Sequence, residues 1–426
     1  MAETREPKQT ARTPGLPELP LYYLLVGLYF FAFGTQFVLF PSLVAFQLHA
    51  TPEGVGLAQS ALSAPMFCLL LFGGLLAERV KSGPTLAKLQ LALAFASLAL
   101  AYVVARGQLS YPILIAYALF AGACAAFVAP VRDAALNGVI ARDAARGRAT
   151  PIATAAAATT AVQIGAQILG ILVARFAGAT PAPYLALQGL VLAIGALAAL
   201  SLRAPKPTGH ERSINGALRD LGDGLAYAFR NPVMSPMLIA AAYVGVFVVG
   251  SFQVLFPLII REAYGGDAPT QAEHLSTLFA SFWTASFVSA VVLSRIKPPK
   301  HPGRALIIAN FVDASVLVTF AFHKPFWVFV AIVICWGLAA GVAISMSRTI
   351  VQSAANRQYL GRVLAVYSMG FMGGAPIGSA LTGFAASELG PRIAALIPGA
   401  GLAIASVLLA ALTPLWRFTP ERAAEA

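Results

Sequence analysis

The sequence predicts an all-α membrane protein in which twelve transmembrane helices form two related six-helix bundles. Three observations lead to this fold class. Of the 426 residues, 58% are hydrophobic and only 11% are charged, whereas soluble domains carry about 25% charged residues. The apolar residues gather in twelve long stretches, and the two halves of the chain resemble each other. So low a charge content excludes an ordinary soluble domain, a disordered chain and a coiled coil.

Each apolar stretch is long enough for one membrane-spanning helix, which needs about 20 apolar residues. Lys88 lies near one end of the third stretch, where its long side chain can reach the membrane surface. Asp313 lies near the middle of the ninth stretch, an unusual place for a carboxylate. The predicted spans are 21–48, 54–77, 84–105, 110–131, 149–174, 178–202, 233–260, 275–294, 305–322, 325–347, 363–387 and 393–416.

The basic residues predict the orientation of these spans. Most of the 29 Lys and Arg residues lie in the two tails and in the loops on the same side as the tails. By the positive-inside rule, both termini are cytoplasmic. The first stretch is too long for a signal-peptide core and is retained as a helix. Compact loops favour a bacterial inner membrane, in which the lipid bilayer surrounds a monomer.

The chain repeats itself after 216 residues, which indicates a duplicated six-helix unit. This shift places Gly34 on Gly250 and Arg132 on Arg348, and a shift two or three residues shorter aligns spans 5 and 11. Between the halves, apolar residues recur at helical spacing from Ile214 to Phe229, which predicts an amphipathic helix on the membrane surface, either a spacer or a regulatory element. The predicted parts are a tail (1–20), a first bundle (21–202), a cytoplasmic linker (203–232), a second bundle (233–417) and a tail (418–426).

Several chemistries are absent from the sequence. The net charge of +12 comes from basic residues between the spans and therefore does not indicate a nucleic-acid partner. Cys68, Cys124 and Cys335 lie far apart within apolar stretches, as packing residues do. No phosphate-binding loop of the type G-x-x-x-x-G-K-[ST] occurs, and no nucleophile–base pair or metal-ligand set lies at membrane depth. We therefore expect no enzymatic activity and no cofactor, and energy from an ion or substrate gradient.

The loop between spans 2 and 3 resembles a signature of the major facilitator superfamily. Residues 74–83 read GLLAERVKSG and are similar to G-x-L-a-D-r-x-G-r-k, with Glu78 in place of the aspartate and the glycine and basic positions exchanged. Residues 127–134, 217–232 and 361–378 together resemble the branch called transmembrane secretion effectors, which contains an enterobactin exporter and macrolide efflux pumps.

The resemblance implies a substrate cavity between the two halves, near the middle of the membrane. Spans 1, 4, 7 and 10 would line it, together with parts of spans 2, 5, 8 and 11, while spans 3, 6, 9 and 12 would be scaffold. Amide and aromatic side chains on these spans suit a small amphiphilic molecule, or else they form hydrogen bonds between helices. The candidates are Tyr29, Phe33, Gln36, Gln59, Gln163, Gln167, Tyr243, Gln253 and Trp283.

The leading interpretation is a secondary transporter that exports a drug, macrolide or siderophore by alternating access, coupled to protons. A lysophospholipid flippase of the same fold and a non-transporting membrane scaffold or receptor are the alternatives. Asp313 is the candidate proton-coupling carboxylate. Its alternative role is a structural hydrogen bond within a peripheral helix.

Charged residues at the cytoplasmic ends of the spans predict a gate. By the resemblance, Glu78 caps the start of span 11, Arg79 pairs with Asp133, and Arg132 faces the cavity. This latch would close the cytoplasmic side in the outward-facing state. The alternative is that these charges are solvated and mark topology only. The gating candidates are Glu78, Arg79, Arg132, Asp133, Arg348 and Arg362.

Overall fold

A computed structural model describes residues 18–145, 147, 150–178, 180–202, 214–296, 299–356 and 359–419, and these residues form helices joined by loops. The predicted tails lie almost wholly outside the described residues, as do residues 203–213 of the predicted linker. Eleven helices within the described ranges are long and apolar enough to cross a membrane. A further helix of 28 residues, α2, occupies the second predicted span.

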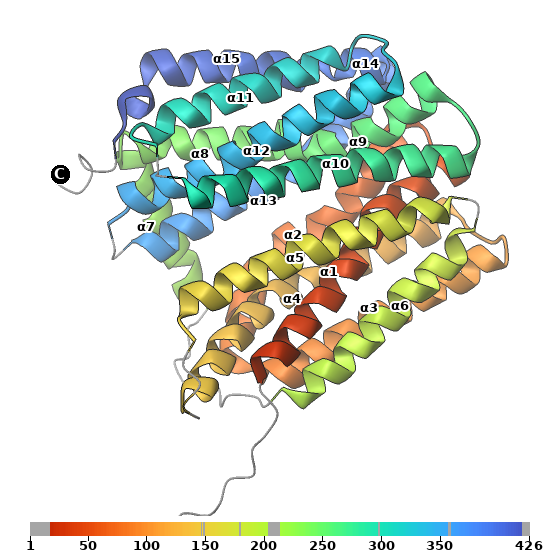
Figure 1. Ribbon diagram of the computed structural model, residues 1–426, viewed down its shortest axis with the longest axis horizontal. Helices are drawn as coiled ribbons and strands as arrows, with labels where there is room; N and C mark the ends of the chain where they lie inside the picture. Colours follow the sequence, from red (N-terminus) through yellow and green to blue (C-terminus); the bar gives the residue numbers. More distant parts are fainter. Residues whose placement is uncertain are drawn as a thin grey trace, which may run out of the picture.

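The first bundle contains six long helices, drawn from red to yellow-green in Figure 1. Its first rod ends in a π-helical turn, η1, and a short 3₁₀ turn, η2, extends the fifth helix. The elements are α1 (Glu18–Ser42), η1 (Leu43–Gln47), α2 (Pro52–Arg79), α3 (Ser82–Ala105), α4 (Tyr111–Ala145), α5 (Ile152–Ala174), η2 (Arg175–Ala177) and α6 (Pro181–Ser201).

The second bundle is drawn from green to blue (Figure 1) and follows a separate helix, α7. Its first rod is continuous through two π-helical stretches, η3 and η4. The elements are α7 (Ile214–Arg230), α8 (Met234–Tyr243), η3 (Val244–Val249), α9 (Gly250–Ile259), η4 (Ile260–Tyr264), α10 (Ala268–Arg295), α11 (Pro302–Thr319), α12 (Phe326–Ala354), α13 (Leu360–Leu389), α14 (Pro391–Ala394), α15 (Leu396–Leu412) and η5 (Pro414–Arg417).

Several helices extend beyond the apolar stretches that predicted them. The fourth span was predicted to end at residue 131, but α4 continues to Ala145. The tenth was predicted to end at residue 347, and α12 continues to Ala354. Hydropathy identifies only the part of a helix that lies in the apolar core of the membrane. Backbone hydrogen bonds within the helix can continue beyond that part into water. The extra turns place charged side chains beyond the apolar core.

The structure shows the internal repeat in its caps and in its packing. Thr51 caps α2 by accepting a hydrogen bond from the Gly54 N–H (3.1 Å), and Asp267, 216 positions later, caps α10 in the same way through Thr270 (3.1 Å). In the first bundle α1 packs on α5, α2 on α4, and α3 on α6. In the second, the first rod packs on α13, α10 on α12, and α11 on α15. The pairing of helices is thus the same in both halves.

The two bundles meet through α2 with α13 and α5 with α10. We call the end of the molecule that carries α7 the α7 end, and the opposite one the far end. Contacts between the bundles lie toward the far end: Arg261 donates to the carbonyls of Ala45 (3.1 Å) and Ala50 (2.7 Å), and Ser276 donates to that of Ile171 (2.7 Å). The bundles diverge toward the α7 end (Figure 1). The space between them is therefore closed at the far end.

The amphipathic helix predicted in the linker is present as α7 and packs on the start of α13. The Tyr227 ring stacks on Tyr359 at 4.4 Å between centroids, and its hydroxyl accepts a hydrogen bond from the Asn356 N–H (3.2 Å). Asp223 lies 3.8 Å from Arg362. These contacts fasten α7 to the second bundle.

Candidate functional site

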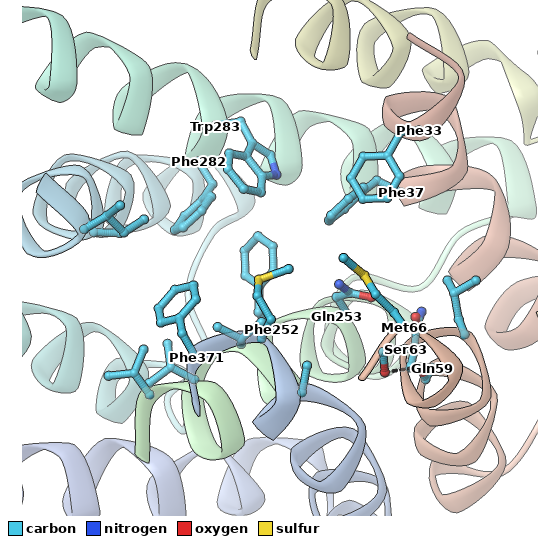
Figure 2. A pocket seen from close by; sticks show the side chains of 18 of the residues that line it. Phe33, Phe37, Gln59, Ser63, Met66, Phe252, Gln253, Phe282, Trp283 and Phe371 are labelled. Carbon is cyan, nitrogen blue, oxygen red and sulfur yellow. Dashed lines mark hydrogen bonds between the residues drawn. The ribbon is translucent and has the colours of Figure 1, made fainter. Parts of the chain in front are cut away.

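A cavity of about 320 Å³ lies between the two bundles and is lined by both. This volume is at the lower end of the range found for small-molecule sites, about 300–1,000 Å³. Figure 2 shows side chains from α1 and α2 on one side facing side chains from α9, α10 and α13 on the other. Every substrate contact in such a cavity would change if one bundle moved against the other.

Aromatic rings form the broadest part of the cavity wall. Phe37 of α1 meets Trp283 of α10 edge to face, with ring centroids 6.0 Å apart, and so joins the two bundles (Figure 2). Phe252 lies 4.6 Å from Phe282 and 5.4 Å from Trp336. The indole N–H groups of Trp283 and Trp336 have no acceptor among the described residues. The wall can therefore stack on a ligand and still donate hydrogen bonds to it.

Amide side chains supply most of the remaining polarity. Gln188 donates to Gln36 (3.3 Å) and to the Tyr117 hydroxyl (3.4 Å), but its own carbonyl oxygen has no donor among the described residues. Gln59 is 2% exposed, and its side-chain oxygen is likewise unpaired within the described chain. Gln253 extends into the same space (Figure 2). Buried polar atoms without partners are costly, so these amides are available to a ligand.

Asp313 also lines the cavity, although we expected the ninth span to be scaffold. Its side chain is buried, and its Oδ1 atom has no hydrogen-bond donor among the described residues. Asn310, one turn earlier on α11, reaches the same space. The scaffold assignment is also wrong for spans 3 and 6, since α3 and α6 contribute lining residues.

Six of the nine substrate-binding candidates line this cavity, and three do not. Gln163 and Gln167 lie on α5, outside the lining of the cavity. Gln167 lies where α1 and α5 approach closely, and its backbone carbonyl faces Gly34. Tyr243 donates to the Pro398 carbonyl (3.2 Å) and stacks on Phe247. Helical spacing shows that residues share a face, but not what that face packs on. The candidates found in the lining are Tyr29, Phe33, Gln36, Gln59, Gln253 and Trp283.

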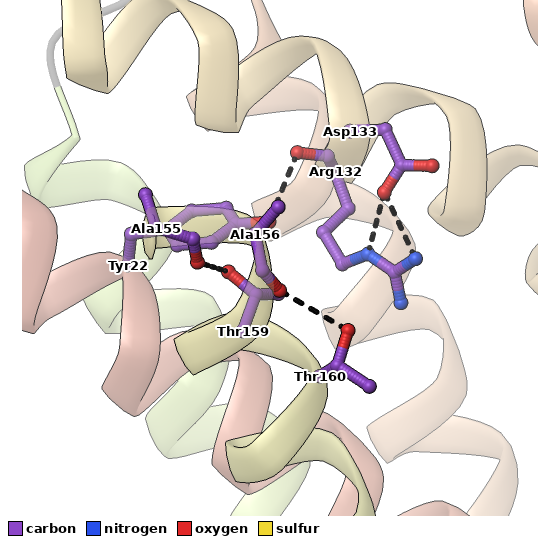
Figure 3. Close-up of polar contacts among 7 residues, drawn as sticks. All are labelled: Tyr22, Arg132, Asp133, Ala155, Ala156, Thr159 and Thr160. Atoms are coloured by element: carbon purple, nitrogen blue, oxygen red, sulfur yellow. Dashed lines mark hydrogen bonds and ion pairs between the residues drawn. The ribbon is translucent and has the colours of Figure 1, made fainter. Parts of the chain in front are cut away.

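The described gating candidates all lie toward the α7 end. Arg132 donates to Asp133 through Nε (3.1 Å) and Nη2 (2.9 Å), and its backbone carbonyl accepts from Tyr22 (3.4 Å), as Figure 3 shows. The structure thus pairs Asp133 with its neighbour in α4, whereas we predicted a pair with Arg79. Of the predicted latch, only the Glu78 contact with the start of α13 would join the two bundles, because Arg79 and Asp133 lie on α2 and α4 of the first bundle, which pack together. The Glu78 side chain lies outside the described part of the chain.

The remaining gating residues lie near the ends of helices at the α7 end of the molecule. Arg79 ends α2, and Arg348 is exposed on the last turns of α12. Arg362, near the start of α13, lies beside Asp223 of α7. The described chain therefore pairs Arg362 with the linker, a partner for which the loop signature gave no indication.

Sequence reasoning missed several lining residues. Phe37 follows Phe33 by four residues, so the helical spacing used for Tyr29 and Phe33 could have found it. Asn310 lies three residues before Asp313 and shares its face. No pattern in the sequence marks Gln188 on the sixth span, because only the packing of α6 against α1 brings it to Gln36.

The comparisons with known proteins agree with this architecture. A family profile described as transmembrane secretion effector matches residues 38–422. The enterobactin exporter EntS of Citrobacter koseri is 24% identical over 377 residues, which cover 87% of this chain and 85% of the relative. The EntS protein of Shigella flexneri is 24% identical over 375 residues, with the same coverage. The predicted resemblance is thereby confirmed.

Solved transporter structures share the fold at low sequence identity. The nucleoside transporter NupG has a TM-score of 0.74 at 14% identity, covering 95% of this chain and all of its own. A bacterial homologue of the human lysosomal transporter Spinster, in an inward-facing and unoccupied conformation, has a TM-score of 0.66 at 13% identity over 96% of this chain and 97% of its own. These likenesses confirm the predicted fold class.

Proposed function

We propose that this chain, which belongs to the transmembrane secretion effector family, exports a small amphiphilic organic molecule. Its family and fold make it a multi-pass membrane protein and a secondary transporter of the major facilitator superfamily, not an enzyme. The direction of transport and the substrate class are the proposed part. The cavity between the bundles is the observation that carries them.

The lining of the cavity supports an amphiphilic substrate. Rings from both bundles, such as Phe37 and Trp283, offer stacking surfaces. Unpaired polar atoms, such as the Gln59 oxygen and the Trp283 N–H, offer single neutral hydrogen bonds. A few polar groups within an apolar wall are typical of sites for organic ligands. Sugars would need a denser set of polar groups.

The arrangement of contacts supports export by alternating access. By the positive-inside rule we take the α7 end as cytoplasmic, and a cavity open toward that end would load its substrate from the cytoplasm. Release would require the far-end contacts of Arg261 and Ser276 to break while the α7 end closes. In that state Glu78, Arg79, Asp133 and Arg362 would form the latch.

Proton coupling completes the proposal. Asp313 is the only acidic or basic side chain among the described residues that line the cavity. Ionisable groups at membrane depth are costly and usually functional. A carboxylate that gains a proton from outside and loses it inside would link substrate export to the proton gradient, which makes the transporter an antiporter.

Transport into inverted membrane vesicles tests the proposal. Their cytoplasmic face points outward, so an exporter fills the lumen with N-phenyl-1-naphthylamine or enterobactin when the lumen is acidified. We expect accumulation that a protonophore abolishes and that vesicles lacking the protein do not show. Failure to accumulate either probe would contradict the proposal. Translocation of labelled lysophosphatidylethanolamine without flux of these probes would instead support the flippase.

A further inference from the structure

We propose that the cavity is built for a lipophilic organic cation, whose positive charge is held by the Asp313 carboxylate. This inference rests on the proposed export function and narrows its substrate to one chemical class. It follows from three properties of the cavity: the sign of its charge, the burial of the side chain that carries this charge, and the aromatic residues in its lining.

The charge of the lining has one sign. Among the described lining residues Asp313 is the only Asp or Glu, and none is Lys, Arg or His. Of the helices packed against α11, α15 carries no titratable side chain, α12 carries Cys335 and Arg348, and η5 carries Arg417; these three side chains are exposed. Arg132 lies over the Phe30 ring and is paired with Asp133. The basic residues thus stay outside the lining, and the cavity has a formal charge of −1 when Asp313 is ionised.

The carboxylate is placed where it needs a partner. Asp313 is 5% exposed, and its Oδ1 atom has no donor among the described residues. An unpaired charge at membrane depth is costly, and such residues are usually paired or functional. A cation in the cavity would supply the missing partner, whereas an anion would add a second buried negative charge. The bound ligand most compatible with this site is therefore positive.

The aromatic residues suit a cation with apolar substituents. Phe252, Phe282 and Trp336 form one cluster with centroid distances of 4.6 to 5.4 Å, and Trp283 adjoins it at 5.5 Å from Phe282. All four residues line the same cavity as Asp313. Ring faces attract cations, and the attraction is stronger when the pair is removed from water. A small hydrated cation would lose this benefit, so the ligand is a bulky organic one.

A single carboxylate that binds either a proton or the organic cation would also explain antiport. A protonated Asp313 has no charge to offer an organic cation, and a cation bound at Asp313 disfavours its proton. Two tyrosines, Tyr29 and Tyr367, also line the cavity, and their hydroxyl groups can form hydrogen bonds. Proton and substrate would therefore occupy the site in turn, as exchange requires.

Two ions of the same shape and opposite charge test the sign of the site. Tetraphenylphosphonium and tetraphenylborate each carry four phenyl rings around a central atom. Equilibrium dialysis of radiolabelled tetraphenylphosphonium with the purified full-length protein should show saturable binding. Unlabelled tetraphenylphosphonium should compete, and tetraphenylborate should not. Equal or tighter binding of the borate would overturn the proposal, and so would the absence of saturable phosphonium binding.

Three variants test the role of the carboxylate. Asp313→Asn keeps the shape of the side chain and should weaken phosphonium binding by about tenfold or more. Asp313→Glu restores the charge and should bind within about threefold of the original protein. The control Asp267→Asn removes a carboxylate from the far-end surface and keeps the cap of α10; it should leave binding unchanged. Unaltered affinity in a folded Asp313→Asn variant, or failure of Asp313→Glu to bind while it melts normally, would overturn the assignment.

Transport measurements separate this inference from the proposed function. Asp313-dependent phosphonium binding without flux of any probe would leave the cation site standing and refute export. Proton-driven flux of N-phenyl-1-naphthylamine without phosphonium binding would leave export standing and refute the cation site. Flux of both, with phosphonium flux abolished in Asp313→Asn, would support the two together.

Discussion

The far end and the α7 end of the bundle interface are built from different interactions. At the far end, polar side chains of one bundle donate to backbone carbonyls of the other, as Arg261 does to Ala45 and Ala50. At the α7 end, charged side chains are satisfied within one bundle or by the linker, as in Arg132–Asp133 and Arg362–Asp223. The closed far end is thus held by hydrogen bonds and by an ion pair between the bundles, from Arg175 to Glu273, while these two charged pairs of the open end form without the opposite bundle.

Close approach at the far end depends on glycine, and the largest effect should come from filling it. A Cβ at Gly56 would lie 2.5 Å from the Ser379 carbonyl oxygen and 2.8 Å from Gly383. Gly56→Ala should hold the far end open and reduce transport by about tenfold or more. Initial rates in inverted vesicles measure the effect. Gly165→Ala, where a Cβ would meet nothing within 4 Å, is the matched control. Equal transport rates for the two variants would show that transport does not require the close contact between α2 and α13.

Replacing Arg261, which donates hydrogen bonds between the bundles at the far end, should have the next largest effect. Arg261→Gln loses the charged hydrogen bonds to Ala45 and Ala50, each worth about 1.5–3 kcal/mol. The population should shift toward the state that is open at the far end. Labelling of a cysteine introduced at Ser42, which is buried on α1, should then become faster. Arg261→Lys keeps the charge and should shift the population less. An unchanged labelling rate in Arg261→Gln would mean that these hydrogen bonds do not keep the far end closed.

The latch predicted at the α7 end should have a smaller effect. Exposed ion pairs contribute about 0–1 kcal/mol, and Asp133 is exposed in this open state. Asp133→Asn or Glu78→Gln should destabilise the outward-facing state only, raise the accessibility of the α7 half of the cavity and slow transport by a few-fold. Cysteine labelling in that half is the measurement. The latch hypothesis fails when neither variant raises labelling.

Acid should weaken the far end slightly through the cap of α10. Hydrogen bonds from the Thr270 hydroxyl and N–H lower the pKa of Asp267, which lies outside the spans. Because the pKa of Asp267 is lower in the folded protein, the ionised cap stabilises the folded state fully at pH values above the unfolded pKa of about 3.9. This stabilisation is lost as the pH falls through the lower pKa of the folded state. Thermal unfolding between pH 7 and pH 3 should therefore show a larger loss for the original protein than for Asp267→Asn, whose cap does not titrate. Parallel pH profiles would contradict this origin.

The sequence predicted the aromatic and amide character of the cavity better than its exact lining. Tyr29, Phe33 and Gln36 recur on one helical face, and that face lines the cavity. Gln163 and Gln167 show the same regularity on α5, but their face lies outside the lining. The two patterns are alike in sequence, because periodicity records which residues share a face and leaves its partner open.

The positions of the spans could be predicted from the sequence, because transfer of apolar residues into lipid is a local property summed along the chain. Which polar groups meet depends on tertiary packing. Helix packing brings Asp313 of α11 into the lining of the cavity, and the packing of α6 against α1 brings Gln188 to Gln36. Both outcomes depend on the packing of helices distant in sequence, and no local pattern encodes that packing.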